Sequence, residues 1–170
     1  VLAATNAFSI NILPEDSAKV EELPGFVKDA LAHDAQVAGK EGWLVTLQQP
    51  SYSPFMTYSS DSELKKELWM AYNSRAFGGE LDNSEVIKRI SELRLKIANL
   101  LGYDTYADYV LEERMAENAP TVNNFLKELL DASRKLAQQD FDTLAQYAKS
   151  QSGQELTPWD ISYYNEKYRV

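Results

Sequence analysis

The sequence predicts a mainly α-helical protein with a minor element of two β-strands in its N-terminal half. Apolar residues recur at steps of three and four through most of the chain, whereas only two short segments alternate with period two. Hydrophobic residues make up 44% and charged residues 25% of the 170 positions, which is ordinary usage for a folded protein. A chain of this length can bury a sizeable core. We therefore expect residues 1–170 to form a single helical unit.

The two expected strands lie on either side of the first helical segment. In residues 8–12 apolar side chains alternate with polar ones, and the pattern stops at Pro14. Residues 43–47 repeat the alternation, and Pro50 and Pro54 close it, because proline cannot donate a hydrogen bond to a sheet. Two strands this short are expected to pair with each other.

Helical spacing predicts two groups of helices in the first half of the chain. Residues 15–39 show this spacing first, and Pro24 is placed where it would start a second helix. Ser60 and Glu63 have the spacing of a capping box, which predicts a helix start at this point. The apolar spacing continues from there until the glycine pair at 78–79 breaks it.

The second half of the chain is expected to be almost entirely helical. The clearest helical pattern covers residues 82–101, and Gly102 follows it in the position of a left-handed helix cap. Residues 105–111 predict a short aromatic helix. A long helix with an apolar stripe along one side is expected from residue 119 to Gly153. A final helix is expected to start at Pro158.

The supply of histidine and cysteine restricts the chemistry that this chain can perform. It has one histidine, His33, and no cysteine. Zinc sites, thiol nucleophiles and Ser-His-Asp triads each need these side chains in a set number. We interpret His33 as an exposed histidine, since no second imidazole is present to share a metal. A Mg²⁺ or Ca²⁺ protein is a weaker alternative, because no calcium-binding loop occurs.

Charge and hydropathy exclude two classes of partner. The formal net charge is −9, and Lys and Arg form no cluster dense enough to follow a phosphate backbone, so nucleic acid is not expected to bind. The apolar runs are far shorter than the ~20 residues that span a bilayer, so no membrane partner is expected. The absence of cysteine fits a reducing compartment, which predicts a cytoplasmic location, and an exported protein stays open as an alternative.

Pairs of neighbouring acidic residues recur along the chain. They lie at positions 21–22 and 112–113, and at Asp140 with Asp142. Residues one or two apart on a helix point in different directions, so such neighbours do not converge on a common ligand. We interpret these pairs as solvated faces.

An aromatic cluster near the C-terminus has two interpretations. Its members are Trp159, Tyr163 and Tyr164, with Asp160 and Glu166 nearby. They could line a cleft that grips a peptide backbone. Aromatic residues at helical spacing are more often packed in a core, and packing is the favoured interpretation.

Six stretches of the sequence, read in order, carry a resemblance to a known family. They are residues 4–8 (ATNAF), 42–47 (GWLVTL), 82–86 (DNSEV) leading to 93–97 (LRLKI), 101–109 (LGYDTYADY), 114–116 (RMA) and 158–164 (PWDISYY). In this order and at these distances they resemble the thimet oligopeptidase family of zinc metallopeptidases. The resemblance is strongest to its bacterial peptidyl-dipeptidase and oligopeptidase A branches, and it covers essentially the whole chain.

The resemblance implies that the chain is a multi-helix fragment of a zincin-type oligopeptidase, upstream of the zinc-binding motif. Members of this family bind zinc through H-E-x-x-H and a further Glu, and cleave short peptides in a channel between two helical lobes. No residue of this sequence matches that motif, so no catalytic, cofactor-binding or metal-binding residue is assigned. The fragment itself is expected to be inactive, and its partners would be peptide substrates and the rest of the same polypeptide.

Two further expectations follow from the resemblance. The longer parent is expected to be a zinc peptidase, and release of dipeptides is favoured over internal cleavage. A stand-alone helical protein-interaction module, which would dock a partner through its aromatic C-terminal helix, stays open as the alternative from a different functional class.

Overall fold

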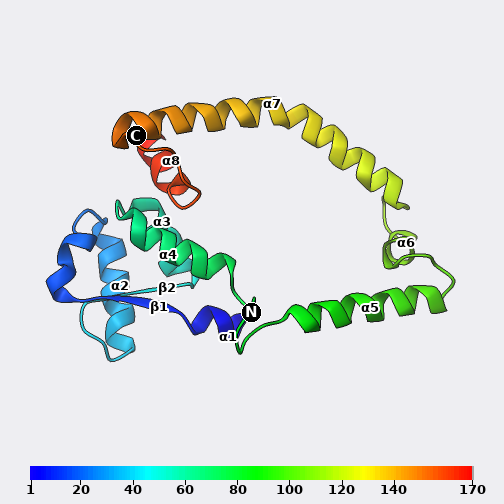
Figure 1. Cartoon of the computed structure of the whole chain (residues 1–170), viewed down its shortest axis with the longest axis horizontal. Helices are drawn as coiled ribbons and strands as arrows, with labels where there is room; N and C mark the ends of the chain where they lie inside the picture. The colour runs from blue at the N-terminus through cyan, green and yellow to red at the C-terminus, as the bar shows by residue number, and fades with distance from the viewer. Residues whose placement is uncertain (170) are drawn as a thin grey trace. The chain divides into compact units, whose positions relative to one another are not determined.

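The computed structural model describes residues 1–169 and divides into two compact units. The first unit contains residues 1–81 and the chain from residue 143 onward, and the second contains Asp82–Asp142. Helices dominate both units, and a two-stranded sheet lies in the first (Figure 1). The mainly α-helical class with a minor two-stranded β element is confirmed. The expectation that residues 1–170 are one unit excised from a longer protein stays a prediction.

The first unit combines a short two-stranded sheet with several helices. Strand β1 (Ser9–Ile12) pairs antiparallel with β2 (Trp43–Thr46), as the two alternating segments predicted, and Ser9 lies opposite Thr46. The elements are α1 (Leu2–Asn6), β1 (Ser9–Ile12), the 3₁₀-helix η1 (Pro14–Val20), α2 (Gly25–Val37), β2 (Trp43–Thr46), α3 (Gln49–Tyr58), α4 (Ser62–Asn73) and α8 (Ile161–Arg169).

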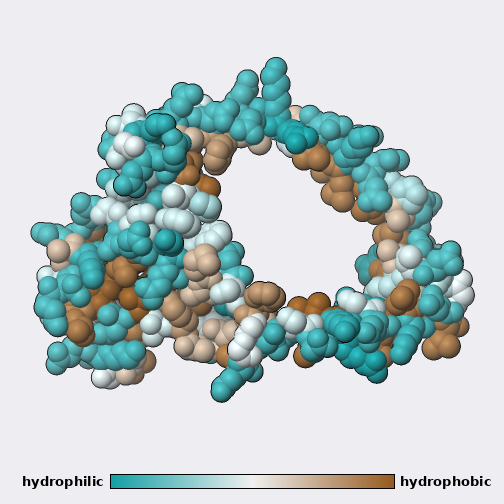
Figure 2. Space-filling view, viewed as in Figure 1, coloured by the Kyte–Doolittle hydropathy of each residue, from teal (hydrophilic) through white to brown (hydrophobic). Residues whose placement is uncertain are grey.

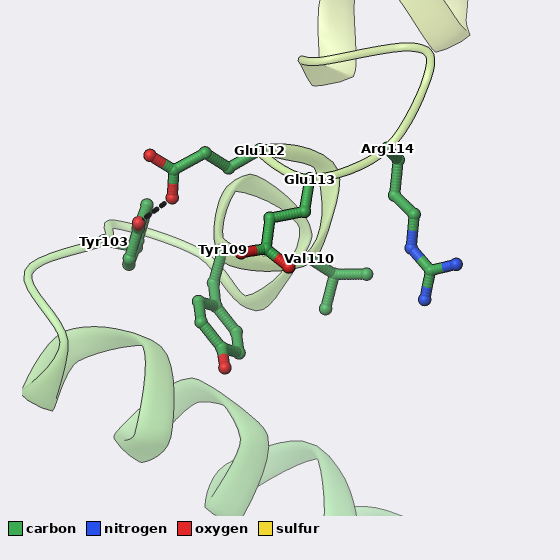
Figure 3. Close-up of a pocket in the computed structure, with 6 residues that line it drawn as sticks. All are labelled: Tyr103, Tyr109, Val110, Glu112, Glu113 and Arg114. Atoms are coloured by element: carbon green, nitrogen blue, oxygen red, sulfur yellow. Dashed lines mark hydrogen bonds between the residues drawn. The ribbon is translucent and has the colours of Figure 1, made fainter.

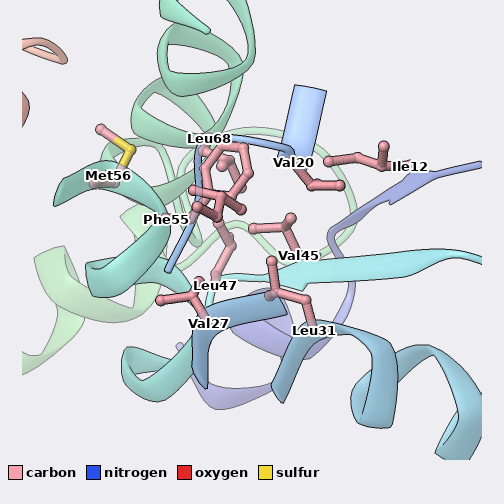
Figure 4. Packing of buried hydrophobic residues seen from close by; sticks show 10 residues of the cluster. Ile12, Val20, Val27, Leu31, Val45, Leu47, Phe55, Met56 and Leu68 are labelled. Atoms are coloured by element: carbon pink, nitrogen blue, oxygen red, sulfur yellow. The ribbon is translucent and has the colours of Figure 1, made fainter. Parts of the chain in front are cut away.

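The core of the first unit forms where α2, α3 and α4 meet the sheet. Val27 of α2, Val45 of β2 and Phe55 of α3 converge there (Figure 4). Full burial of each such side chain stabilises the fold by about 1.5–3 kcal/mol. The buried cluster consists of Ile12, Val20, Leu23, Val27, Leu31, Val45, Leu47, Phe55, Met56 and Leu68.

One glycine is required where the sheet closes. Gly42 has φ +82°, a conformation that L-residues with a side chain rarely adopt. A Cβ at this position would lie 2.1 Å from the carbonyl oxygen of Ile12, so the close approach of the two strands leaves no room for a side chain. Gly42 therefore fixes the turn into β2.

The second unit consists of α5 (Ser84–Leu100), α6 (Tyr106–Leu111) and the first part of α7 (Ala119–Ser152). Helix α5 ends as predicted at Gly102, whose φ is +87°. The N–H of Gly102 donates to Asn99 O and that of Tyr103 to Ala98 O, which is the Schellman arrangement. Thr105 caps α6 by accepting a hydrogen bond from the N–H of Asp108. The predicted long helix extends over 34 residues as α7.

Three local predictions in the first unit differ from the structure. Helix α1 was not expected. Helix α3 was not expected either, because Pro50 and Pro54 were interpreted as the end of a strand. Pro50 instead lies in the first turn of α3, where its missing N–H costs no helical hydrogen bond. The cap of α4 is Asp61, which accepts from the N–H of Leu64, and not Ser60.

The apolar stripes of α5 and α7 are exposed in the second unit. Figure 2 shows hydrophobic residues gathered along one side of each helix. Within α5 only Ala98 is buried, and within α7 only Ala148, which belongs to the first unit. The exposed stripe residues include Val86, Ile87, Ile90, Leu93, Ile97, Leu100, Phe125, Leu126, Leu129, Leu130, Leu136 and Phe141.

Candidate functional site

A buried ion pair in the first unit joins α4 to the segment just before α8. Lys65 of α4 is 1% exposed, and its Nζ lies 2.7 Å from Oδ1 of Asp160, just before α8. The other carboxylate oxygen of Asp160 accepts from the hydroxyls of Ser62 (2.7 Å) and Thr157 (2.6 Å). Trp159 donates its indole N–H to the Ser62 hydroxyl at 3.0 Å. Every polar group of this cluster is thereby satisfied.

The surroundings of the pair shift the pKa values of both partners downward. Burial tends to raise the pKa of the Asp160 carboxyl, but hydrogen bonds from Lys65, Thr157 and Ser62 outweigh it and hold that pKa below its usual value. Burial lowers the pKa of the Lys65 ammonium, and the hydrogen bond and charge of Asp160 offset this only in part. Asp160 therefore stays ionised at neutral pH.

An aromatic ring covers the cation of the pair. The Lys65 ammonium lies 4.1 Å from the ring centroid of Tyr163, within the range of a cation–π contact. A small polar cavity of about 170 Å³ adjoins the pair, and Ser152, Glu155 and Tyr164 contribute to its wall. Because Lys65 and Asp160 already neutralise each other, the pair is better suited to fix the start of α8 than to perform acid–base chemistry.

Tyr163 also lines a second, larger groove. We call it the Tyr58–Tyr163 groove; it measures about 460 Å³ and its walls are mainly apolar. Its two aromatic walls come from the end of α3 and from α8. The groove is lined by Glu22, Pro24, Thr57, Tyr58, Tyr163, Glu166 and Lys167.

A stacked group ties the N-terminal helix to α4. The guanidinium of Arg75 lies 3.5 Å from the ring centroid of Tyr72, and Tyr72 stacks on Tyr52 at 4.3 Å and 19°. Nη1 of Arg75 also donates to the hydroxyl of Thr5 at 3.1 Å. Burial raises the pKa of the Tyr52 phenol, Tyr72 raises it further, and the charge of Arg75 partly opposes both. The group holds α1 in place.

The second unit has its own cavity, of about 480 Å³, beside α6 (Figure 3). Tyr103 and Glu112 both line it, and the hydroxyl of Tyr103 donates to the carboxylate of Glu112. That hydrogen bond is the main reason why the pKa of Tyr103 is raised. Glu113 and Arg114 also line the cavity. Tyr103 is exposed enough to water that we assign it no chemistry.

Within residues 1–169 no group of three or more His, Asp or Glu side chains could hold a metal ion. His33 is exposed on α2, as interpreted from the sequence. Glu21 and Glu22 are exposed, as solvated faces should be.

Within residues 1–169 every helix is too short or too polar to cross a bilayer.

The structure divides the predicted aromatic cluster between two roles. Trp159 packs edge-on against Trp69 at 6.1 Å, which agrees with the packing interpretation. Tyr163 and Glu166 instead line the Tyr58–Tyr163 groove. Sequence reasoning missed Lys65, although one signal was present. Lys65 occupies the apolar stripe that continues through Leu68, and a lysine on such a stripe needs a buried partner.

Comparison with known proteins gives one family match. Residues 55–170 match the profile described as "Peptidase family M3". This range runs from the middle of α3 through α8, so it includes Lys65, Asp160 and most of the groove.

Individual relatives carry the same family's names. The chain is 40% identical over 157 residues to "Oligopeptidase A" of Salmonella typhimurium, which covers 87% of the chain and 23% of that protein. It is 38% identical to "Oligopeptidase A" of Escherichia coli, and the match covers 92% of this chain and 24% of that protein. With "Dipeptidyl carboxypeptidase" of Escherichia coli the identity is 28%, covering 88% and 23%. The chain thus spans about a quarter of the length of these relatives.

Proposed function

Because the chain belongs to peptidase family M3, we propose that it is a helical part of a longer zinc metallopeptidase that hydrolyses short peptides. The observation that carries the proposal is the match to the family profile over residues 55–170, supported by 40% identity to an oligopeptidase. The location proposed for the longer protein is the cytoplasm, as expected from the sequence.

The residues present do not fit a catalytic zinc site. Such a site takes three protein ligands, most often from His and Glu, and leaves a fourth position for water. The sequence has a single histidine, and the described residues 1–169 contain no suitable cluster of three ligands. We therefore propose that the longer protein binds zinc through residues outside this chain, and that this chain alone does not hydrolyse peptides.

The chain's own contribution would be structural. Long amphipathic helices such as α5 and α7 are suited to form the wall of a substrate channel, since their apolar sides are free to pack against further protein. The buried Lys65–Asp160 pair would hold α8 in a fixed orientation where the chain continues toward the proposed zinc-binding region. Positioning of this kind needs rigid elements and no titrating group.

Cleavage specificity has two candidates. Dipeptide release was favoured from the sequence, and the 28% identity to a dipeptidyl carboxypeptidase supports it. The identities of 40% and 38% to the two oligopeptidases support internal cleavage more strongly. We propose oligopeptidase activity first. Mass spectrometry of the products decides between them, because only a peptidyl-dipeptidase releases successive dipeptides from the C-terminus.

The test compares the 170-residue chain with the full product of the reading frame that encodes it. Both are purified and assayed on a fluorogenic peptide of about eight residues, with and without a zinc chelator. We expect hydrolysis by the full product, its loss with chelator, and no hydrolysis by the 170-residue chain. Hydrolysis by the purified 170-residue chain, or a full product without an H-E-x-x-H motif, would contradict the proposal.

A stand-alone helical interaction module is the second candidate. The exposed apolar stripes of α5 and α7 favour it, because such surfaces commonly mark sites of protein contact. The same experiment separates the two candidates: an interaction module gives no peptidase activity in the full product, with or without zinc.

A further inference from the structure

We infer that the Tyr58–Tyr163 groove binds a short peptide with free ends, taking one apolar or aromatic side chain between its two tyrosines. The inference rests on the proposed function, because a peptide-cleaving enzyme is exposed to such ligands. It concerns residues of this chain, and none of them belongs to the proposed zinc centre. The volume of the groove, about 460 Å³, lies in the ~300–1,000 Å³ range of small-ligand sites.

The aromatic walls of the groove are held in place before any ligand arrives. Tyr58 packs edge-on against Phe26, with ring centroids 6.0 Å apart at 88°. Tyr163 lies over the ammonium of Lys65, whose position is fixed by the ion pair with Asp160. A wall that is already ordered loses little conformational freedom on binding, and this favours affinity.

The charges at the rim of the groove are complementary to a free peptide. Glu22 is an exposed carboxylate in the turn before α2, and Lys167 is an exposed ammonium on α8. Among residues 1–169 no ion pair joins either of them to another charged side chain. The third charged residue of the rim, Glu166, lies 3.6 Å from the guanidinium of Arg169, which partly neutralises it.

A short peptide at neutral pH carries an ammonium at one end and a carboxylate at the other. Glu22 can accept from the ammonium while Lys167 donates to the carboxylate, and the apolar side chain fills the space between Tyr58 and Tyr163. A blocked peptide of the same sequence can make the apolar contact but not the two charged ones. Recognition of both ends would favour short fragments over segments within an intact protein.

The test uses the isotope-labelled full chain and NMR titration with the tripeptide Ala-Leu-Phe. A second titration uses the same tripeptide with an acetylated N-terminus and an amidated C-terminus. We expect saturable shifts at Tyr58, Tyr163 and Lys167 with the free peptide, and binding weakened about five- to twentyfold by the two blocking groups. Each exposed ion pair contributes about two- to fivefold to such an affinity.

Two charge variants and one filling variant make the test specific. Lys167→Met should lower the affinity for the free peptide two- to fivefold and leave the affinity for the amidated peptide unchanged. The matched variant Lys135→Met on α7 should change neither affinity. Glu22→Gln should likewise lower the affinity for the free peptide and leave the affinity for the acetylated peptide unchanged, and Glu128→Gln is its control. Thr57→Trp fills the groove and should abolish binding, while circular dichroism confirms that the variant is folded.

Three results would overturn the inference. They are absence of saturable shifts at groove residues, equal affinity for free and blocked peptide, and undiminished binding by a folded Thr57→Trp variant. None of them depends on catalysis, so failure here is distinguishable from failure of the proposed peptidase function, which is read from the full reading frame.

Discussion

Lys65 and Asp160 show how strongly a single buried charge depends on its partner. The Lys65 side chain is 1% exposed and that of Asp160 is 11% exposed. Replacement of both charges by apolar groups can be nearly neutral, whereas removal of one leaves the other buried without compensation. The pair is therefore weak evidence for extra stability but strong evidence for a fixed geometry at the start of α8.

We expect Lys65→Met to lower the free energy of unfolding by about 3 kcal/mol or more, because the Asp160 carboxylate loses its cation. Urea denaturation followed by circular dichroism measures this. The neighbouring variant Lys66→Met removes only an exposed cation 5.5 Å from the ring of Trp159, so a loss below about 1 kcal/mol is expected. Equal losses for the two lysines would show that burial of Lys65 has no energetic consequence.

The pH dependence of stability should also report on this pair. The folded pKa of Asp160 lies below the value of 3.8 for an ordinary Asp, so between the two the unfolded chain binds more protons than the folded chain. The stabilisation is complete above the unfolded pKa and is lost as pH falls through the folded pKa. The lowered pKa of Lys65 gives a slope of the same sign at alkaline pH. There too the unfolded chain binds more protons than the folded chain, so stability rises with pH.

The acid arm of this dependence is the one to measure. We expect urea midpoints of the unaltered chain to fall more steeply than those of Asp160→Asn as the pH decreases through and below 3.8, because the asparagine cannot titrate at this position. Identical slopes for the two proteins would mean that Asp160 has an ordinary pKa in the folded state.

At the scale of elements, the start of α4 shows why helix caps are hard to place from a pattern. Ser60 and Glu63 have capping-box spacing, yet the chain begins the helix one residue later. Asp61 then accepts the N–H of Leu64, while the hydroxyl of Ser59 accepts the N–H of Asp61. Adjacent residues that can all cap make the register ambiguous, and packing of Lys65 and Leu68 decides it.

This assignment predicts different effects for neighbouring substitutions. Asp61→Ala should lower the free energy of unfolding by about 1 kcal/mol, and Ser60→Ala should change it by less than about 0.5 kcal/mol. Asp61→Asn keeps the capping oxygen and controls for the loss of charge near Lys65. Thermal or urea unfolding measures the stability of all three variants. A larger effect at Ser60 than at Asp61 would show that Ser60 is the cap, as the capping-box spacing predicted.

Helix α3 also forms against a local signal in the sequence. Two prolines within five residues favoured the end of a strand over a helix, because proline removes a backbone donor. The element forms nonetheless, since it buries Phe55 and Met56 against the core and Pro50 occupies the first turn. Long, capped elements such as α5 were predicted closely, because their local signals all agree.

At the scale of the whole molecule, the exposed apolar stripes of α5 and α7 determine how the isolated chain should behave. Phe125 is 59% and Leu129 51% exposed, one turn apart on α7. Surfaces of this kind associate in water because association removes apolar area from solvent. In the proposed longer protein the same surfaces would pack against further chain.

We expect the 170-residue chain to self-associate with rising concentration in static light scattering. The double variant Phe125→Ser with Leu129→Ser should reduce the association, since it removes two large, exposed apolar groups of the stripe. Lys127→Ser with Asp131→Ser changes the same number of residues at the same spacing and should have little effect. A monomer at all concentrations would show that these faces are satisfied within the chain itself.

The sequence alone determined the mainly helical class, the two paired strands, the ends of α5 and α7, and the family, because each depends on local periodicity or on the order of short motifs. It left the site undefined. Lys65 and Asp160 are 95 positions apart, and Tyr58 and Tyr163 are 105 positions apart. Only the docking of α8 onto α3 and α4 brings the members of each pair together. Contacts between residues so distant in the chain depend on packing in three dimensions, which the pattern of any one segment does not encode.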